Sequence, residues 1–175
     1  MGNFSDVWKR WLAENGPRLL LFARGWGKTR EDAEDLVQEA VLKMWHYQQE
    51  ENRGGKPPDL PLVFSTIRFA GLMLHRSEKR RRKREEAIVY LNDFQDVWLD
   101  PVMEDDEDSV RLRDAVQNLS DKLREVIVMK TWGGLTFAQI SEVLAISPNT
   151  AASRYRYALE QLTQDLKQMR EERHA

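Results

Sequence analysis

The chain has 175 residues, and 27 Lys and Arg against 29 Asp and Glu leave a formal net charge of −2. This length is sufficient to bury a hydrophobic core without covalent cross-links. The sequence has no cysteine, which excludes disulfides, thiolate zinc sites and a cysteine nucleophile and is compatible with a reducing compartment. It shows neither a signal peptide nor an apolar run long enough to span a bilayer. We therefore expect a cytoplasmic protein without membrane insertion.

Charge is segregated along the chain, although the net charge is small. A basic cluster between residues 76 and 84 has a single acid, Glu78, and comprises Arg76, Lys79, Arg80, Arg81, Arg82, Lys83 and Arg84. An acidic stretch between residues 91 and 109 has no Lys or Arg and comprises Asp93, Asp96, Asp100, Glu104, Asp105, Asp106, Glu107 and Asp108. The basic cluster would attract a polyanion. We interpret the acidic stretch as a linker between two domains.

Helical spacing of apolar residues recurs from end to end, and strand patterns are nearly absent, which predicts an all-α fold of two small helical domains. Residues 1–90 form the first domain, 91–109 the acidic linker and 110–175 the second domain. In the first domain we expect a helix interrupted at Gly16-Pro17, a second beginning at Thr29 or Arg30, an exposed connection over 48–61, and a third beginning near Leu62. The six Trp residues are expected to be core anchors, not base-stacking platforms.

The second domain contains two closely spaced helix starts. After a helix over 112–119, Ser120 is expected to cap the next one. Thr136 and Gln139 are spaced as a capping box, and Ser147-Pro148 supplies a cap followed by proline at the first helical position. Two short helices joined by a tight turn predict a helix-turn-helix.

The second helix of this pair has two distinct faces. One is the expected buried stripe: Ala151, Tyr155, Ala158, Leu159 and Leu162. The other carries hydrogen-bonding and basic groups suited to the DNA major groove: Asn149, Thr150, Ala152, Ser153, Arg154, Arg156 and Tyr157.

These residues resemble the fourth conserved region of the sigma-70 family, in its small extracytoplasmic-function (ECF) branch. The segment from Leu119 to Val126 resembles the helix that precedes the DNA-reading pair, and Thr150-Ala151-Ala152-Ser153-Arg154 resembles the start of the recognition helix. The resemblance implies recognition of the minus-thirty-five promoter element, with Asn149, Thr150, Ser153, Arg154 and Arg156 as DNA contacts.

The segment Asp32-Ala33-Glu34-Asp35-Leu36-Val37-Gln38-Glu39-Ala40 is similar to the second-region motif of the same family. The resemblance implies that Asp35, Gln38 and Glu39 contact the β′ coiled coil of core RNA polymerase, with the β subunit as a further contact of the protein. It also implies that the acidic linker threads through polymerase channels.

The resemblance places minus-ten recognition on the helix over 64–84, and the predicted DNA contacts are Arg68, Phe69, Arg76, Lys79 and Arg80. Relatives usually carry an Asn and an Asp in this helix, and this chain has neither between Ile67 and Arg76. Which side chains capture minus-ten bases is therefore open, and so is the existence of an anti-sigma partner.

An enzymatic function would require groups that this sequence does not supply. The histidines His46, His75 and His174 are scattered, and Gly25-Trp26-Gly27-Lys28-Thr29 lacks the spacing and preceding strand of a phosphate loop. We expect no catalytic site, cofactor or metal. Two non-enzymatic functions stay open beside that of a sigma factor: a stand-alone helix-turn-helix regulator, and a polymerase-binding adaptor that does not open promoters.

Overall fold

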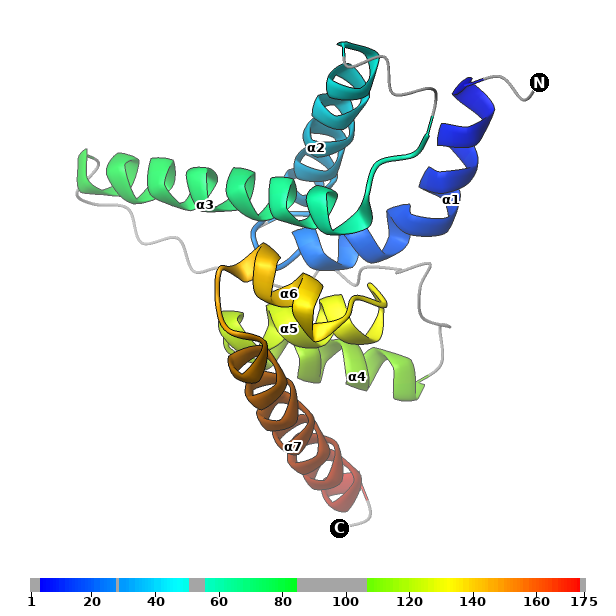
Figure 1. Cartoon of the computed structure of the whole chain (residues 1–175). Coiled ribbons are helices and arrows are strands. Elements are labelled where there is room, and N and C mark those ends of the chain that lie inside the picture. Colours follow the sequence, from blue (N-terminus) through cyan, green and yellow to red (C-terminus); the bar gives the residue numbers. More distant parts are fainter. Residues whose placement is uncertain (1–3, 28, 51–55, 85–106, 174–175) are drawn as a thin grey trace.

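The computed structural model describes residues 4–27, 29–50, 56–84 and 107–173, and these contain seven helices and no strand. The all-α prediction is confirmed. The helices are α1 (Phe4–Ala23), α2 (Arg30–Glu50), α3 (Leu60–Arg84), α4 (Glu107–Asn118), α5 (Asp121–Thr131), α6 (Phe137–Leu144) and α7 (Pro148–Arg173), as labelled in Figure 1.

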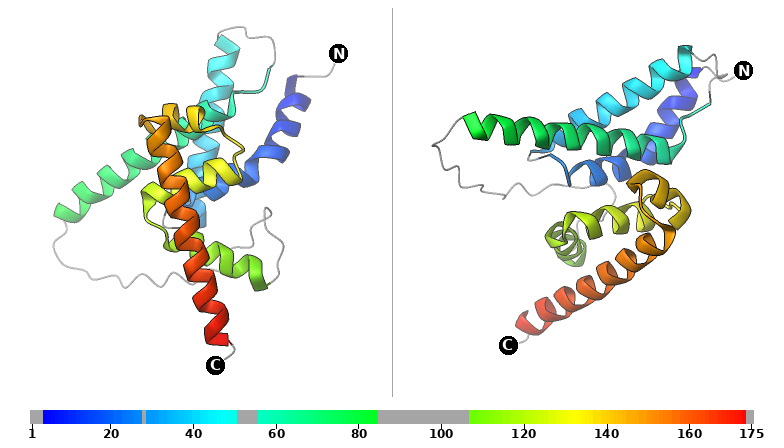
Figure 2. Two further views of the ribbon diagram at one scale, coloured as in Figure 1. Left: turned by 60° about the horizontal axis from the view of Figure 1, so that its bottom comes forward. Right: turned by 60° about the vertical axis from the view of Figure 1, so that its left-hand side comes forward.

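The helices form two bodies that lie against each other. α1, α2 and α3 pack together in the N-terminal body, and α7 packs on α4, α5 and α6 in the C-terminal body. Figure 2 shows the two bodies from two further sides. Contacts of α3 with α6, and of α1 with α5, join them. α4 begins at Glu107, inside the range predicted as linker, whereas 85–106 lie outside the described residues; the domain boundaries stay predictions.

The predicted interruption at Gly16-Pro17 is wrong, because α1 continues through both residues. A proline inside a helix removes one backbone donor, and its ring crowds the Cβ of the preceding residue. Glycine at position 16 has no Cβ, so the second of these costs is reduced. The helix bends along its length in Figure 1, as proline helices do.

The connection predicted over 48–61 is shorter than expected. α2 continues to Glu50 and α3 begins at Leu60, two residues before the predicted start. Of its described residues Lys56, Pro57 and Asp59 are exposed, as predicted, whereas Pro58 is buried.

Close packing of aromatic residues holds the N-terminal body together. The rings of Phe22 and Phe64 meet edge to face with centroids 4.9 Å apart, and those of Trp8 and Trp45 do so at 5.0 Å. Trp8, Trp11 and Trp26 are buried, while Trp45 and Trp132 pack at the margin of the core. The prediction that tryptophans anchor the core is confirmed for these residues.

Gly71 allows Trp26 to lie directly on α3. A Cβ at position 71 would lie 2.5 Å from Cγ and 2.6 Å from Cβ of Trp26. These atoms are at the base of the indole side chain, so they cannot move away without displacing the turn between α1 and α2. The absence of a side chain at this position therefore sets the distance between that turn and α3.

We predict that Gly71→Ala destabilises the protein by about 1–3 kcal/mol, because the new methyl group overlaps Trp26. Helix propensity alone predicts that the substitution increases stability, since alanine favours helices over glycine by about 1 kcal/mol. Urea unfolding measures the difference. Met73→Ala, at an exposed position of the same helix, is the control and should change stability by less than about 0.5 kcal/mol. Unchanged or increased stability of Gly71→Ala would contradict the packing argument.

Candidate nucleic-acid interface

The helix-turn-helix prediction rests on two caps, and the structure confirms the first. Thr136 Oγ1 accepts a hydrogen bond from the Gln139 backbone N–H at 3.2 Å, and Gln139 Oε1 accepts one from the Thr136 N–H at 2.9 Å. This reciprocal pair is a capping box. It satisfies two backbone donors at the start of α6 and fixes where that helix begins.

The turn and the second cap follow immediately. Ala145 has φ 53°, in the left-handed region, and the N–H of Ile146 donates to the Ser141 carbonyl at 3.0 Å. Ser147 Oγ accepts from the Thr150 N–H at 3.0 Å, which confirms Ser147 as the cap of α7. The Thr150 hydroxyl also lies 2.8 Å from Ser147 Oγ, so this predicted DNA contact takes part in the cap.

The buried stripe of α7 is confirmed with one exception. Ala151, Ala158 and Leu162 are buried, and the half-buried Tyr155 meets the Phe137 ring edge to face at 5.7 Å. Leu159 is 42% exposed, so its placement in the stripe is wrong. At about 100° per residue it lies roughly 70° from the middle of the stripe, beyond the edge that the other helices cover.

On the opposite face of α7, some predicted DNA contacts are exposed and others are half-buried. Asn149 and Arg156 are exposed, whereas Ser153 and Arg154 are half-buried. Tyr157 is 62% exposed and adds an aromatic ring to the face. Arg156 is thus an open cationic donor on the helix that a helix-turn-helix inserts into DNA.

Helix α3 carries the second set of predicted contacts. Phe69 is 59% exposed, and Arg76 is exposed as well. The side chains of Lys79 and Arg80 lie outside the described residues, although the helix itself continues to Arg84. Leu62 and Met73 are also exposed and extend the apolar face around Phe69. Their spacing of seven and four residues from Phe69 is a signal that sequence reasoning could have used.

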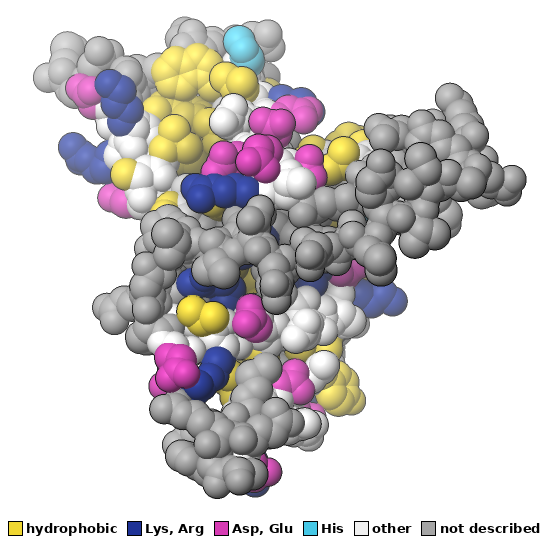
Figure 3. Space-filling view, turned by 180° about the vertical axis from the view of Figure 1, so that it is seen from behind, with side chains coloured by type: hydrophobic (Ala, Val, Ile, Leu, Met, Phe, Trp, Pro, Cys, Tyr) yellow, Lys and Arg dark blue, Asp and Glu magenta, His cyan; other side chains and the backbone are white. Residues whose placement is uncertain are grey.

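Helix α2 presents the predicted polymerase contacts. Asp35, Gln38 and Glu39 are exposed on one side of it, and Glu39 pairs with Lys43 at 2.6 Å. Leu42 is 57% exposed beside them and was missed by sequence reasoning, although it lies three residues after Glu39 and so on the same side. Figure 3 shows acidic side chains gathered beside an apolar patch on the N-terminal body.

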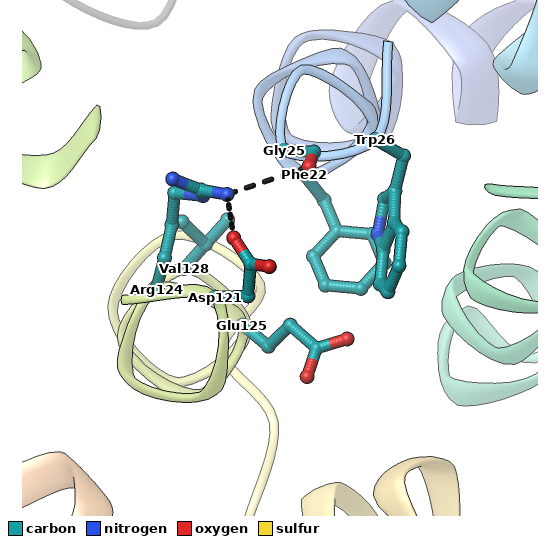
Figure 4. A pocket seen from close by; sticks show the side chains of 7 residues that line it. All are labelled: Phe22, Gly25, Trp26, Asp121, Arg124, Glu125 and Val128. Atoms are coloured by element: carbon teal, nitrogen blue, oxygen red, sulfur yellow. Dashed lines mark hydrogen bonds and ion pairs between the residues drawn. The ribbon is translucent and has the colours of Figure 1, made fainter. Parts of the chain in front are cut away.

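A small cleft lies where the two bodies meet (Figure 4). It is lined from the N-terminal body by Phe22, Gly25 and Trp26 and from α5 by Asp121, Arg124, Glu125 and Val128. Arg124 donates to the Gly25 carbonyl at 3.4 Å and pairs with Asp121 within its own helix.

Beside this cleft, Glu125 pairs with Arg68 of α3 at 2.9 Å. Its side chain is 10% exposed. Burial raises the pKa of the Glu125 carboxyl, while Arg68 and the nearby Arg154 of α7 act to lower it. Arg68, which is predicted to contact DNA, is therefore engaged with a carboxylate of the C-terminal body in this structure.

The described residues contain no group of three metal-ligating side chains and no helix long and apolar enough to cross a membrane. What they present is a capped helix-turn-helix with an open cationic face, a second helix with exposed aromatic and basic groups, and an acidic helix. This combination is that of a DNA-binding protein.

Comparison with known proteins places the chain within a family. Residues 11–82 match the model of sigma-70 region 2, and residues 109–162 match that of sigma-70 region 4. The chain therefore belongs to the sigma-70 family, with the ECF architecture of region 2 followed by region 4, and it acts in promoter recognition with RNA polymerase. No curated protein matches the sequence significantly.

Solved structures agree on the fold. The chain is similar to the sigma factor RpoE of Bartonella quintana in its complex with the anti-sigma factor NepR, with a TM-score of 0.64 and 22% sequence identity. The match covers 91% of this chain and 96% of that one. At this identity the likeness concerns the arrangement of helices.

We predict that Thr136→Ala lowers stability by about 1 kcal/mol, because it removes the side-chain acceptor of the capping box. Thermal unfolding provides the measurement. Ser120→Ala is a matched control, because Ser120 occupies the N-cap position of α5 without a side-chain hydrogen bond. This variant should lose less stability than Thr136→Ala. Equal losses in the two variants would show that the capping box contributes nothing specific.

Proposed function

We propose that this sigma factor docks on the β′ coiled coil of core RNA polymerase through α2, reads the minus-thirty-five element with α7, and engages the minus-ten element with α3. It catalyses no reaction itself and works in the cytoplasm. The observation that carries the proposal is the capped helix-turn-helix, whose second helix leaves Asn149 and Arg156 open.

Docking through α2 is supported by the exposed set Asp35, Gln38, Glu39 and Leu42. The two carboxylates and the amide provide charge and hydrogen-bond acceptors, and Leu42 provides an apolar contact beside them. Interfaces of this kind combine a desolvated apolar anchor with polar groups that set specificity. An acidic face of this type requires a basic surface on its partner, and we assign that surface to the β′ coiled coil.

Reading by α7 is supported by the physical character of its open face. Arg156 can donate two hydrogen bonds to a guanine edge in the major groove, and Asn149 can pair with adenine.

Engagement of the minus-ten element by α3 is supported by exposed Phe69, which can stack on an unpaired base. The basic cluster that follows suits phosphate contacts. Because the usual Asn and Asp are absent, an adaptor that binds polymerase without opening promoters is the second candidate function. The apolar neighbours of Phe69, Leu62 and Met73, favour base capture over the adaptor.

An anti-sigma protein is a further candidate partner. The RpoE structure that this chain resembles was determined with the anti-sigma factor NepR. We propose that a protein of this kind would cover the exposed apolar residues of α3 in the inactive state.

Transcription with purified core polymerase on genomic DNA separates the candidate functions. A sigma factor yields defined transcript starts that are absent without it. An adaptor yields polymerase binding without new transcripts, and a stand-alone regulator yields DNA binding without polymerase binding. Sequencing the transcript ends also identifies the promoter motif used in the following tests.

We predict that Asp35→Ala combined with Glu39→Ala weakens binding to core polymerase by roughly tenfold or more, because both carboxylates of the docking face are lost. Competition binding on purified polymerase measures the effect. The control variant Asp6→Ala with Glu14→Ala removes two carboxylates from exposed positions of α1 and should bind as the parent does. Unchanged affinity of the first variant, with its fold intact, would remove α2 as the docking surface.

We predict that Arg156→Ala weakens binding of the holoenzyme to upstream promoter DNA by about 1–3 kcal/mol, because a base-reading donor is lost. Fluorescence anisotropy with a duplex carrying the mapped element measures the loss. Lys167→Ala removes a cation from the far part of α7, which is also exposed, and should have little effect. Equal affinity in Arg156→Ala would mean that another face of α7 reads DNA.

A further inference from the structure

Three helices of the C-terminal body meet at one aromatic ring. This ring belongs to Phe137, the first residue of α6, and it meets the Tyr155 ring of α7 edge to face with centroids 5.7 Å apart. The ammonium of Lys130, in the last turn of α5, lies 4.9 Å from the centroid of the same Phe137 ring. Phe137 therefore connects the end of α5 to the middle of α7.

The turn between α5 and α6 is held against the end of α5. The Leu135 N–H donates to the Met129 carbonyl at 3.0 Å, and the Leu135 carbonyl accepts from Lys130 Nζ at 3.1 Å. A Cβ at position 133 would lie 2.5 Å from the Met129 carbonyl oxygen, so the glycine there permits this close approach. Both backbone polar groups of Leu135 are thus bonded to α5, and α5 sets where α6 begins.

The orientation of α7 matters for the proposed reading of the minus-thirty-five element, on which this inference rests. Tyr155 directly precedes Arg156, and at about 100° per residue the two side chains leave the helix about 100° apart. Tyr155 contacts Phe137, whereas Arg156 is exposed. A side chain that reads a base must be held within about 10–20° of its productive geometry. Because α7 rotates as a unit, the contact that fixes Tyr155 also fixes the direction of Arg156.

A lysine in a DNA-binding domain is most simply interpreted as a phosphate contact. The Lys130 side chain, however, is half-buried, and its ammonium has the Leu135 carbonyl and the Phe137 ring as partners. We propose that Lys130 is a positioning residue, which sets the angle of α7 through Leu135 and Phe137 and does not contact DNA. Its contribution is to the preference of the protein for its promoter element over other DNA.

Lys130→Met tests the proposal, because methionine keeps an apolar stem and removes the ammonium. Binding of the holoenzyme is measured by fluorescence anisotropy on two duplexes, one with the mapped minus-thirty-five element and one of random sequence. We expect roughly five- to tenfold weaker binding to the mapped duplex, the lower part of the range for a lost base contact. Binding to the random duplex should change by less than about twofold, because phosphate contacts dominate it.

The salt dependence of binding separates positioning from phosphate contact. Loss of a phosphate contact weakens binding to every sequence and reduces the slope of log affinity against log salt concentration by about one. Loss of a positioning residue leaves this slope unchanged and lowers only the preference for the mapped duplex. Lys122→Met removes an exposed cation from the same helix and controls for net charge.

Two further variants separate positioning from general loss of stability. Lys130→Arg keeps a cation that can lie over the Phe137 ring and should restore the preference for the mapped duplex. Phe137→Leu removes the ring and should reproduce the effect of Lys130→Met. The double variant should lose little more than either single variant, because residues that act through one contact are not additive. Circular dichroism checks that each variant is folded at the assay temperature, and Phe137→Leu supplies the comparison if Lys130→Met is not.

The outcomes are distinct from those that test the proposed function. An unchanged preference in Lys130→Met overturns the positioning role and leaves the function standing. Equal weakening on both duplexes with a smaller salt slope overturns it as well, in favour of a phosphate contact, and so does additive loss in the double variant. If the parent holoenzyme shows no preference for the mapped duplex, reading by α7 fails, and the positioning role fails with it.

Discussion

A carboxylate with little access to water imposes the main constraint on this structure. Glu125 lies on α5, whose neighbouring residues Val126 to Met129 are buried in the C-terminal body. Such a charge is costly unless it is paired, and its partner, Arg68, comes from the other body at 2.9 Å. This ion pair joins α3 to α5, beside the contacts of α3 with α6 and of α1 with α5 that also hold the two bodies together.

The exposed surfaces carry residues that are predicted to bind different partners. The acidic side of α2 lies away from the contact between the bodies and is accessible as it stands. The predicted DNA contacts differ in exposure: Arg156 and Phe69 are exposed, whereas Arg68 pairs with Glu125 and Arg154 is half-buried. The predicted polymerase contacts on α2 are thus accessible, whereas Arg68 is occupied by an ion pair.

Local sequence patterns predicted the helices and caps well because these depend on neighbours in the chain. The capping box of Thr136 and Gln139 and the cap at Ser147 involve residues three positions apart, so spacing reveals them. The interruption expected at Gly16-Pro17 was wrong because the glycine relieves the crowding that proline imposes. The burial of Leu159 was wrong because the edge of a stripe depends on how far the neighbouring helices reach, which periodicity does not contain.

The sequence by itself determined the helical class, the helix-turn-helix, the acidic face of α2 and the kinship with sigma-70 regions, because all of these are written in short-range spacing and residue type. Only the tertiary structure decided that Arg68 pairs with Glu125, that Trp26 packs directly on Gly71, and that Arg154 is half-buried. Each of these features depends on residues from helices or turns far apart in the chain. Their meeting depends on how whole helices pack, and a charge pattern along the chain does not specify which opposite charge lies nearest in space.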